Sequence, residues 1–172
     1  FFTVGHTSTS VSLACGLAKA RDLNGEDGNV IAVIGDGSLS GGEALEGLDY
    51  AAELDGNFII VVNDNDMSIA ENHGGLYGNL KLLRDTKGQA ECNLFRAMGL
   101  DYVYVDQGND TASLIDAFSQ VKDSNKPVVV HINTLKGEGY APAEEHKENW
   151  HYCAPFDIKT GEALFQDAEE DY

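Results

Sequence analysis

Two short polar turns hold the residues in this chain that are best suited to chemistry. Gly35-Asp36-Gly37-Ser38 follows one run of β-branched residues, and Asn63-Asp64-Asn65 follows another. Asp36 and Asn65 lie 29 positions apart, which leaves room for one helix and one strand between them. A βαβ step of this kind brings the two turns together at one edge of a parallel sheet. Carboxylate and amide oxygens at that edge suit a magnesium ion that holds a diphosphate. The glycines let the backbone approach the diphosphate closely.

Each turn has a simpler interpretation when it is taken alone. A single Gly-Asp-Gly is more often a turn followed by a helix cap, and asparagine is common in turns. The pair at a βαβ spacing is more specific, since magnesium takes a carboxylate, an amide and a backbone carbonyl besides phosphate and water. The predicted protein ligands are Asp36, Asn65 and the carbonyl of Met67. Ser38 and the N–H groups near Gly37 are predicted to bind phosphate, aided by the helix that follows.

Strands that alternate with helices must carry these turns. Continuous apolar runs predict parallel strands buried on both faces, and apolar residues at helical spacing predict the helices. The predicted strands are 30–34, 58–62, 102–105 and 127–132, and the predicted helices are 8–23, 40–54, 89–98 and 111–122. The stretch 63–80, rich in glycine and asparagine, is expected to be a functional loop.

These elements predict an α/β fold with a mainly parallel sheet flanked by helices. In such a sheet ligands bind beyond the carboxyl ends of the strands, where both polar turns lie. We expect a diphosphate-binding domain over 1–160, incomplete at its N-terminus, and an acidic terminal segment over 161–172. The chain starts at Phe1 and runs directly into a motif, so we expect it to be a fragment or a trimmed chain.

Composition excludes several classes of function. The net charge of −18 argues against a nucleic-acid or anionic-membrane partner, so a diphosphate must be bound locally. Three widely spaced cysteines form no CxxC pair, which argues against a structural zinc or disulfide framework and fits a cytoplasmic location. The longest apolar runs are about five residues, far too short for a membrane span.

Four motifs come in the order of one enzyme family. They are Gly5-His6-Thr7-Ser8-Thr9-Ser10, Gly35-Asp36-Gly37-Ser38, Asn63-Asp64-Asn65-Asp66-Met67-Ser68-Ile69 and Lys136-Gly137-Glu138-Gly139-Tyr140. Together they resemble the 1-deoxy-D-xylulose-5-phosphate synthases, which are thiamine-diphosphate enzymes of the transketolase-like superfamily, over about residues 3–157. The third motif separates this family from ordinary transketolases. The chain nearly lacks a long insertion that family members carry after that motif, which points to a divergent short paralogue.

The resemblance implies a role for particular residues. Asp36, Asn65 and the Met67 carbonyl would bind Mg²⁺, and the remaining matches would contact thiamine diphosphate or substrate. The implied cofactor contacts are Gly5, His6, Thr7, Gly37, Ser38, Asn65 and Tyr140, and the implied substrate contact is His151. Simpler roles stand beside these: Gly5-His6-Thr7 as a helix cap, Tyr140 as a ring packed over its turn, and His151 as a packed histidine.

The implied reaction joins pyruvate to glyceraldehyde 3-phosphate with loss of CO₂, giving 1-deoxy-D-xylulose 5-phosphate for isoprenoid, thiamine and pyridoxal biosynthesis. The family implies a homodimer and a pyrimidine-binding domain, which supplies the glutamate that activates the cofactor and has no counterpart in this sequence. The chain alone is therefore expected to be catalytically incomplete. Two alternatives remain: two-carbon transfer between sugar phosphates, as in transketolases, and a non-catalytic fragment that only binds cofactor.

Overall fold

The computed structural model describes residues 2–164, and its internal contacts divide it into two units, 1–134 and 135–172. Each unit is described by itself. The predicted acidic segment 161–172 lies largely outside the described residues. The boundary predicted at residue 160 stays a prediction.

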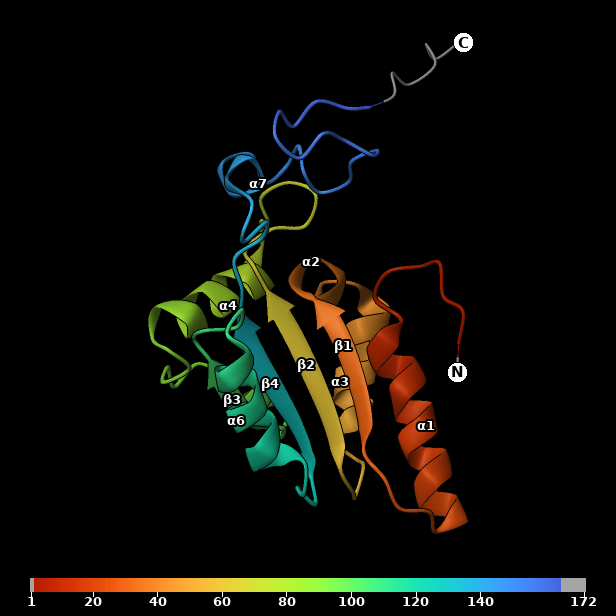
Figure 1. Cartoon of the computed structure of the whole chain (residues 1–172). Coiled ribbons are helices and arrows are strands. Elements are labelled where there is room, and N and C mark those ends of the chain that lie inside the picture. The colour runs from red at the N-terminus through yellow and green to blue at the C-terminus, as the bar shows by residue number, and fades with distance from the viewer. Residues whose placement is uncertain (1, 165–172) are drawn as a thin grey trace. The chain divides into compact units, whose positions relative to one another are not determined.

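The first unit is an α/β layer structure around a four-stranded sheet (Figure 1). Its elements are α1 (Ser10–Asn24), β1 (Val30–Gly35), α2 (Asp36–Leu39), α3 (Gly42–Ala51), β2 (Phe58–Asp64), α4 (Gly75–Asp85), α5 (Leu94–Ala97), β3 (Asp101–Val105), α6 (Thr111–Val121) and β4 (Pro127–Asn133). The strand order is β1-β2-β4-β3, and every pair is parallel. The predicted α/β fold with a mainly parallel sheet is therefore confirmed.

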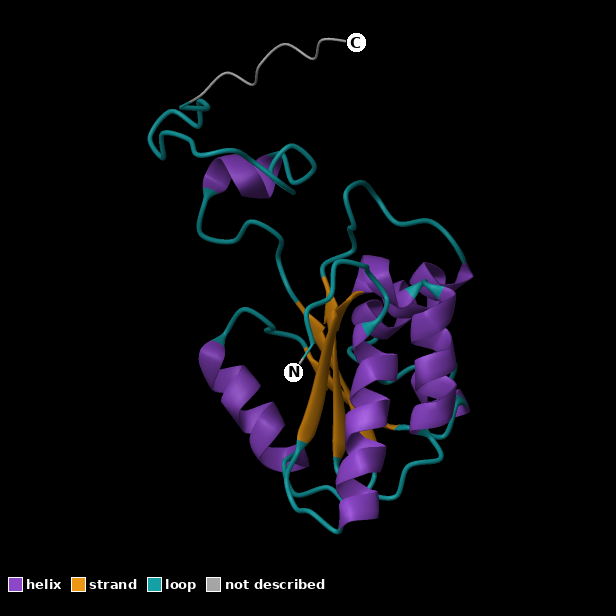
Figure 2. Ribbon diagram, turned by 90° about the vertical axis from the view of Figure 1, so that its right-hand side faces the viewer, coloured by secondary structure: helices purple, strands orange, loops and turns teal. Residues whose placement is uncertain are grey.

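Apolar side chains cover the two faces of the sheet unequally. On one face Ile60 and Val62 pack with residues of α1, α3, α4 and α5 in the larger core. On the other face Ile59 and Val61 pack with α6 in a smaller core. Figure 2 shows this division, with α6 on one side of the strands and the other helices of this unit opposite. Alternate residues of a strand point to opposite faces, which is why neighbouring positions enter different cores.

The expectation that strand 30–34 is buried on both faces is wrong. Ile31 and Val33 are 53% and 61% exposed, whereas Ala32 and Ile34 are buried. β1 is at the edge of the sheet, and α6 packs over the strands further in. A continuous apolar run therefore does not by itself distinguish an edge strand with one covered face from a central strand.

Three further predictions about helices and loops also need correction. Helix α4 occupies 75–85, which includes the end of the stretch expected to be a loop, because Leu80 and Leu83 on one side of it enter the core. The helix predicted over 89–98 is only the short α5, whose N-cap Asn93 accepts hydrogen bonds from the N–H groups of Phe95 and Arg96. The predicted helix 40–54 is shorter too: α3 covers only Gly42–Ala51, because the extended backbone of Gly41 separates it from the turn of helix at Asp36–Leu39.

The first helix begins later than residue 8. Ser8 has φ of 72°, in the left-handed region, so α1 begins at Ser10. The predicted apolar face is confirmed, since Val11, Ala14, Cys15 and Ala18 are all buried. Gly25 ends the helix with φ of 65°, and its N–H bonds the carbonyl of Asp22.

The second unit contains α7 (Ala141–Glu145) and turns. Its core is aromatic: Tyr140 packs edge-on against Trp150 at 5.0 Å between ring centroids, and Trp150 packs against Phe156 at 4.7 Å. Among the residues described in both units, no helix is long and apolar enough to cross a membrane. The three cysteines are free thiols; Cys15 is buried, and Cys92 and Cys153 are exposed.

Candidate metal and diphosphate site

The two polar turns follow neighbouring strands at the same edge of the sheet. β1 and β2 pair in parallel, with Gly35 opposite Asn63, so Asp36 comes directly after one strand where Asp64 ends the other. The expected juxtaposition of the two turns is confirmed. Asp36 is only 2% exposed, and its carboxylate accepts a hydrogen bond from Asn72 Nδ2 at 2.9 Å.

The carboxyl of Asp36 is destabilised in its charged form. Burial and then the nearby charge of Asp64 raise the pKa of Asp36 from 3.8 to about 6, although a hydrogen bond from the Gly37 backbone and the charge of Arg84 oppose this. A divalent cation bound to Asp36 removes that electrostatic cost, because it favours the ionised carboxylate. The environment of Asp36 therefore suits a metal ligand better than a helix cap.

Glycine at position 37 is required by close packing. A Cβ atom on Gly37 would lie 2.4 Å from the Cβ of Ser68, a distance that real side chains do not adopt. The loop after Asn65 therefore closes directly over the Gly35-Asp36-Gly37-Ser38 turn. This contact keeps backbone and small side chains near Asp36, as a phosphate-binding turn requires.

The segment before α1 also reaches this turn. Ser8 Oγ donates a 2.7 Å hydrogen bond to the carbonyl of Ser38, and a Cβ on Gly41 would lie 2.0 Å from that Oγ. Gly5, His6 and Thr7, which precede Ser8, are exposed, and the Nδ1–H of His6 donates to the Thr7 carbonyl at 2.8 Å. Thr9 is the N-cap residue but makes no side-chain capping bond, so the cap interpretation is not supported.

Asn65 and Met67 lie in a tight turn after β2. Asn65 Oδ1 accepts a hydrogen bond from the Met67 N–H at 3.3 Å, and Asp66 between them has φ of 64°. Both residues are partly exposed, unlike Asp36. A carboxylate, an amide and a backbone carbonyl thus come from two adjacent turns, and this oxygen set fits Mg²⁺.

Across residues 2–164, no three His, Cys, Asp or Glu side chains are grouped so that they could hold a metal ion. This observation does not bear on the predicted magnesium set, which combines one carboxylate with an amide, a backbone carbonyl, phosphate and water.

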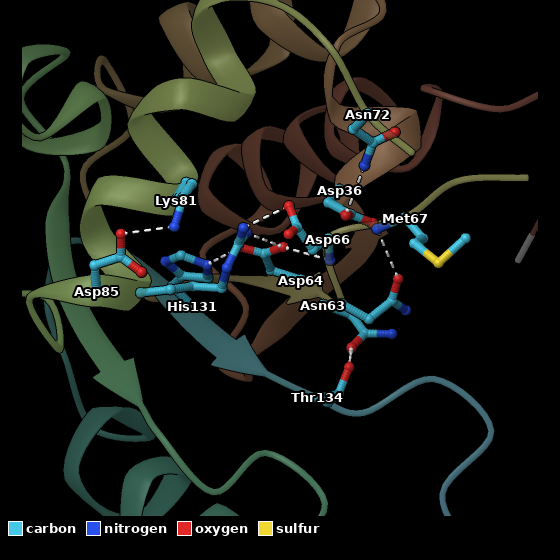
Figure 3. A network of polar contacts seen from close by, with 12 residues as sticks. Asp36, Asn63, Asp64, Asp66, Met67, Asn72, Lys81, Asp85, His131 and Thr134 are labelled. Atoms are coloured by element: carbon cyan, nitrogen blue, oxygen red, sulfur yellow. Dashed lines mark hydrogen bonds and ion pairs between the residues drawn. The ribbon is translucent and has the colours of Figure 1, made fainter. Parts of the chain in front are cut away.

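A buried polar network that the sequence did not reveal is centred on Asp64, the residue before Asn65 (Figure 3). Asp64 is fully buried and accepts hydrogen bonds from Arg84 at 2.6 and 2.7 Å and from His131 Nε2 at 2.8 Å. The phenol of Tyr102 bonds His131 Nδ1 at 2.8 Å. Burial alone would raise the pKa of Asp64, but the hydrogen bonds and charges of His131 and Arg84 hold it below its ordinary value. His131 is itself fully buried, and both of its ring nitrogens are bonded within this network.

Tyr140 and His151 belong to the second unit. The Tyr140 ring packs with Trp150 and Phe156, and its hydroxyl is buried without a hydrogen-bond partner. This packing supports the simpler interpretation of Tyr140. His151 is exposed, with Nδ1 2.9 Å from Lys136 Nζ, so it is not a packed histidine. The roles of both residues toward cofactor and substrate stay predictions.

A pocket of about 710 Å³ lies elsewhere in the first unit. It is lined mainly by apolar residues of α3, α4 and the segment that leads into α5, among them Leu45, Leu76 and Leu94. It includes none of the predicted site residues. The candidate site is instead an open edge of the sheet, where backbone groups and two turns converge.

Comparison with known proteins supports the shortened connection between α4 and α5. A family model matches the chain in two pieces, residues 1–92 and 84–134, which meet at this connection. The alignment with a relative from Geobacter metallireducens extends over 199 positions, more than the 172 residues of this chain, so that relative has residues without a counterpart here. A relative from Listeria monocytogenes aligns with 93% of this chain over only 167 positions, so its alignment needs no insertion of that length.

The same comparisons identify the family. The matching model is that of 1-deoxy-D-xylulose-5-phosphate synthase. The Geobacter and Listeria relatives, both named 1-deoxy-D-xylulose-5-phosphate synthase, are each 40% identical over 95% and 93% of this chain. The chain spans 32% and 27% of their lengths. The structure resembles Campylobacter jejuni transketolase with a TM-score of 0.61 and 25% identity, over 82% of this chain and 21% of that one. The chain thus belongs to the 1-deoxy-D-xylulose-5-phosphate synthase family.

Proposed function

We propose that this chain is the magnesium- and diphosphate-binding part of a thiamine-diphosphate enzyme. The enzyme would condense pyruvate with glyceraldehyde 3-phosphate, release CO₂ and form 1-deoxy-D-xylulose 5-phosphate. The observation that carries the proposal is the buried carboxylate of Asp36, which lies at the end of β1 next to the Asn63-Asp64-Asn65 turn at the end of β2. Family membership supports the choice of cofactor and reaction.

Five residues in or directly after the two turns have a defined task in this proposal. Asp36, Asn65 and the carbonyl of Met67 hold Mg²⁺, while Gly37 and Ser38 bind the diphosphate through backbone N–H and hydroxyl groups. When bound, thiamine diphosphate supplies the carbanion chemistry that the protein lacks. This chain fixes the cofactor's charged end, which determines where its reactive ring is directed.

The remaining predicted contacts complete the proposed site. Gly5, His6 and Thr7 line the cofactor, Tyr140 contacts it and His151 faces the substrate. The glutamate that activates the aminopyrimidine would come from a pyrimidine-binding domain elsewhere in the same polypeptide or in a partner chain, as part of a homodimer. The chain spans only 32% of the length of the Geobacter metallireducens relative, which leaves room for such a domain in proteins of this family.

The reaction is tested with the complete protein and carboxyl-labelled pyruvate. We expect labelled CO₂ to be released only when thiamine diphosphate, Mg²⁺ and glyceraldehyde 3-phosphate are all present, with one molecule of 1-deoxy-D-xylulose 5-phosphate formed for each CO₂. Mass spectrometry of the sugar product gives this ratio. Release of CO₂ without formation of that sugar would contradict the proposed reaction.

A second candidate function is transketolase-type transfer of a two-carbon unit between sugar phosphates. It is favoured by the structural likeness to Campylobacter jejuni transketolase. The same assay separates the two, since transfer from a ketose phosphate needs no pyruvate and releases no CO₂. Binding of thiamine diphosphate without either reaction would instead support the third possibility, a non-catalytic cofactor-binding protein.

A further inference from the structure

The turn that carries Asn65 is held from both sides by one side chain. The guanidinium of Arg84, on α4, bonds Asp64 through one nitrogen at 2.6 Å and Asp66 through the other at 2.5 Å. Asp64 and Asp66 are the two neighbours of Asn65 in the sequence. The planar guanidinium contacts both neighbours of Asn65 and so restrains the backbone of Asn65. The ammonium group of a lysine, which acts as a point charge, cannot hold two partners in a fixed geometry equally well.

Asp64 adds a second constraint on the same turn. Its Oδ1 accepts the N–H of Asp66 at 3.1 Å, so the carboxylate bends the chain back and helps to hold Asp66 at its left-handed φ of 64°. His131, from β4, bonds the other oxygen of Asp64 at 2.8 Å, and Tyr102, from β3, bonds His131. An ionised carboxylate only accepts hydrogen bonds, so Nε2 of His131 carries the proton in this contact.

These contacts connect three elements of the fold, α4, β4 and β3, to the turn, and they differ in how far they are exposed to solvent. Arg84 and Asp64 have 12% and 0% exposed side chains, so neither solvent nor salt screens their interaction strongly. Asp66, in contrast, is 61% exposed, and its ion pair with Arg84 alone would contribute little. The effect of Arg84 on the turn therefore depends on the geometry of both contacts together.

We propose that Arg84 is a positioning residue for the metal site: through Asp64 and Asp66 it sets the orientation of Asn65 and of the Met67 carbonyl. This inference rests on the proposed function, since it assigns to Arg84 the support of metal ligands proposed above. Residues that hold metal ligands in place typically change metal affinity by about 10- to 100-fold when they are replaced. The hydrogen bonds and ion pairs of the Arg84 side chain go to Asp64 and Asp66, so its geometric effect on Asn65 and Met67 passes through the turn.

The test compares Arg84→Lys and Arg84→Gln with Lys81→Gln in the complete protein. Lys81 is on the same helix and pairs only with Asp85 at the exposed surface, so its replacement is a matched control. The probe is Mn²⁺ with thiamine diphosphate, and free Mn²⁺ is measured by electron paramagnetic resonance. Hydrogen exchange of peptides that contain residues 64–67 reports on the turn itself, and thermal unfolding shows whether each variant folds.

We expect Arg84→Lys to bind Mn²⁺ about tenfold more weakly than wild type and to exchange the Asp66 and Met67 amides faster, because lysine lacks the planar guanidinium. Arg84→Gln should show a larger change, and Lys81→Gln none. If Arg84→Lys bound Mn²⁺ with wild-type affinity and exchanged the Asp66 and Met67 amides at the wild-type rate, the inference would be overturned but the proposed function would stand. A positive charge at position 84 would then be enough, without the geometry of the guanidinium. Failure of the wild-type protein to bind Mn²⁺ would overturn the proposed function and the inference with it.

Discussion

Replacing Asp36 by asparagine is expected to stabilise the metal-free chain at neutral pH by up to about 3 kcal/mol, because a shift of about two pKa units corresponds to that free energy. The physical reason is the raised pKa of Asp36, about 6 in the folded chain against an ordinary value of 3.8. At pH 7 and above the folded protein must keep this carboxylate ionised while it is buried beside Asp64. Asparagine has nearly the same shape and carries no charge.

The pH dependence follows from the same shift. A carboxyl whose pKa is raised by folding binds its proton more tightly in the folded state, so the contribution of Asp36 to wild-type stability falls as pH rises from about 4 through about 6. Above that window the full cost is present. The stability difference is the free energy of unfolding of Asp36→Asn minus that of wild type. This difference should increase as pH rises across this range and then level off. Urea unfolding at a series of pH values, with a chelator present, measures the difference.

Asp49→Asn provides the control for this prediction. Asp49 is exposed on α3, so the same chemical change there should alter the free energy of unfolding much less than the change at the buried Asp36. A flat difference curve for Asp36→Asn would show that Asp36 carries no electrostatic cost. Natural proteins often retain such costs at functional sites, where a ligand removes them.

Replacing Gly37 by alanine is expected to destabilise the chain by about 1–3 kcal/mol, the usual range for extra atoms forced into a packed site. The added Cβ would lie 2.4 Å from the Cβ of Ser68, so the loop after Asn65 must move away from Asp36. In the complete protein the same displacement should weaken the binding of thiamine diphosphate, since the two turns must stay together to share the metal. Urea unfolding and calorimetric titration measure the two effects.

Gly42→Ala separates this clash from a general effect of replacing glycine. Gly42 begins α3, and a Cβ there meets nothing within 4 Å. Alanine favours helix over glycine, so this control should be neutral or more stable by up to about 1 kcal/mol. If Gly37→Ala behaved like Gly42→Ala in both measurements, the close approach of the two turns would not matter for binding.

The sequence predicted the strand ends well because their signals are local. A β-branched run followed by Gly35-Asp36-Gly37 or by Asn63-Asp64-Asn65 combines strand propensity with turn residues in a short window. Their juxtaposition followed from the βαβ rule, since one helix and one strand separate them. The positions of both turns were therefore predictable without knowledge of any other contact.

Burial and the supporting network were not predictable in this way. The exposure of Ile31 and Val33 depends on β1 being an edge strand, which is a property of the whole sheet. Arg84 and His131 meet Asp64 from 20 and 67 positions away, so no local pattern links them. Helix α4 was missed because Gly75 and Gly78 obscure the spacing of its leucines, although packing against the core overrides that low propensity.

The most direct test of the central claim is a calorimetric titration of thiamine diphosphate into the complete protein, with Mg²⁺ and then with a chelator. We predict binding by the wild-type protein only when Mg²⁺ is present, and no measurable binding by Asp36→Asn under either condition, although that variant is folded. Binding by Asp36→Asn with the affinity and magnesium dependence of wild type would contradict the assignment of this edge of the sheet as the metal and diphosphate site.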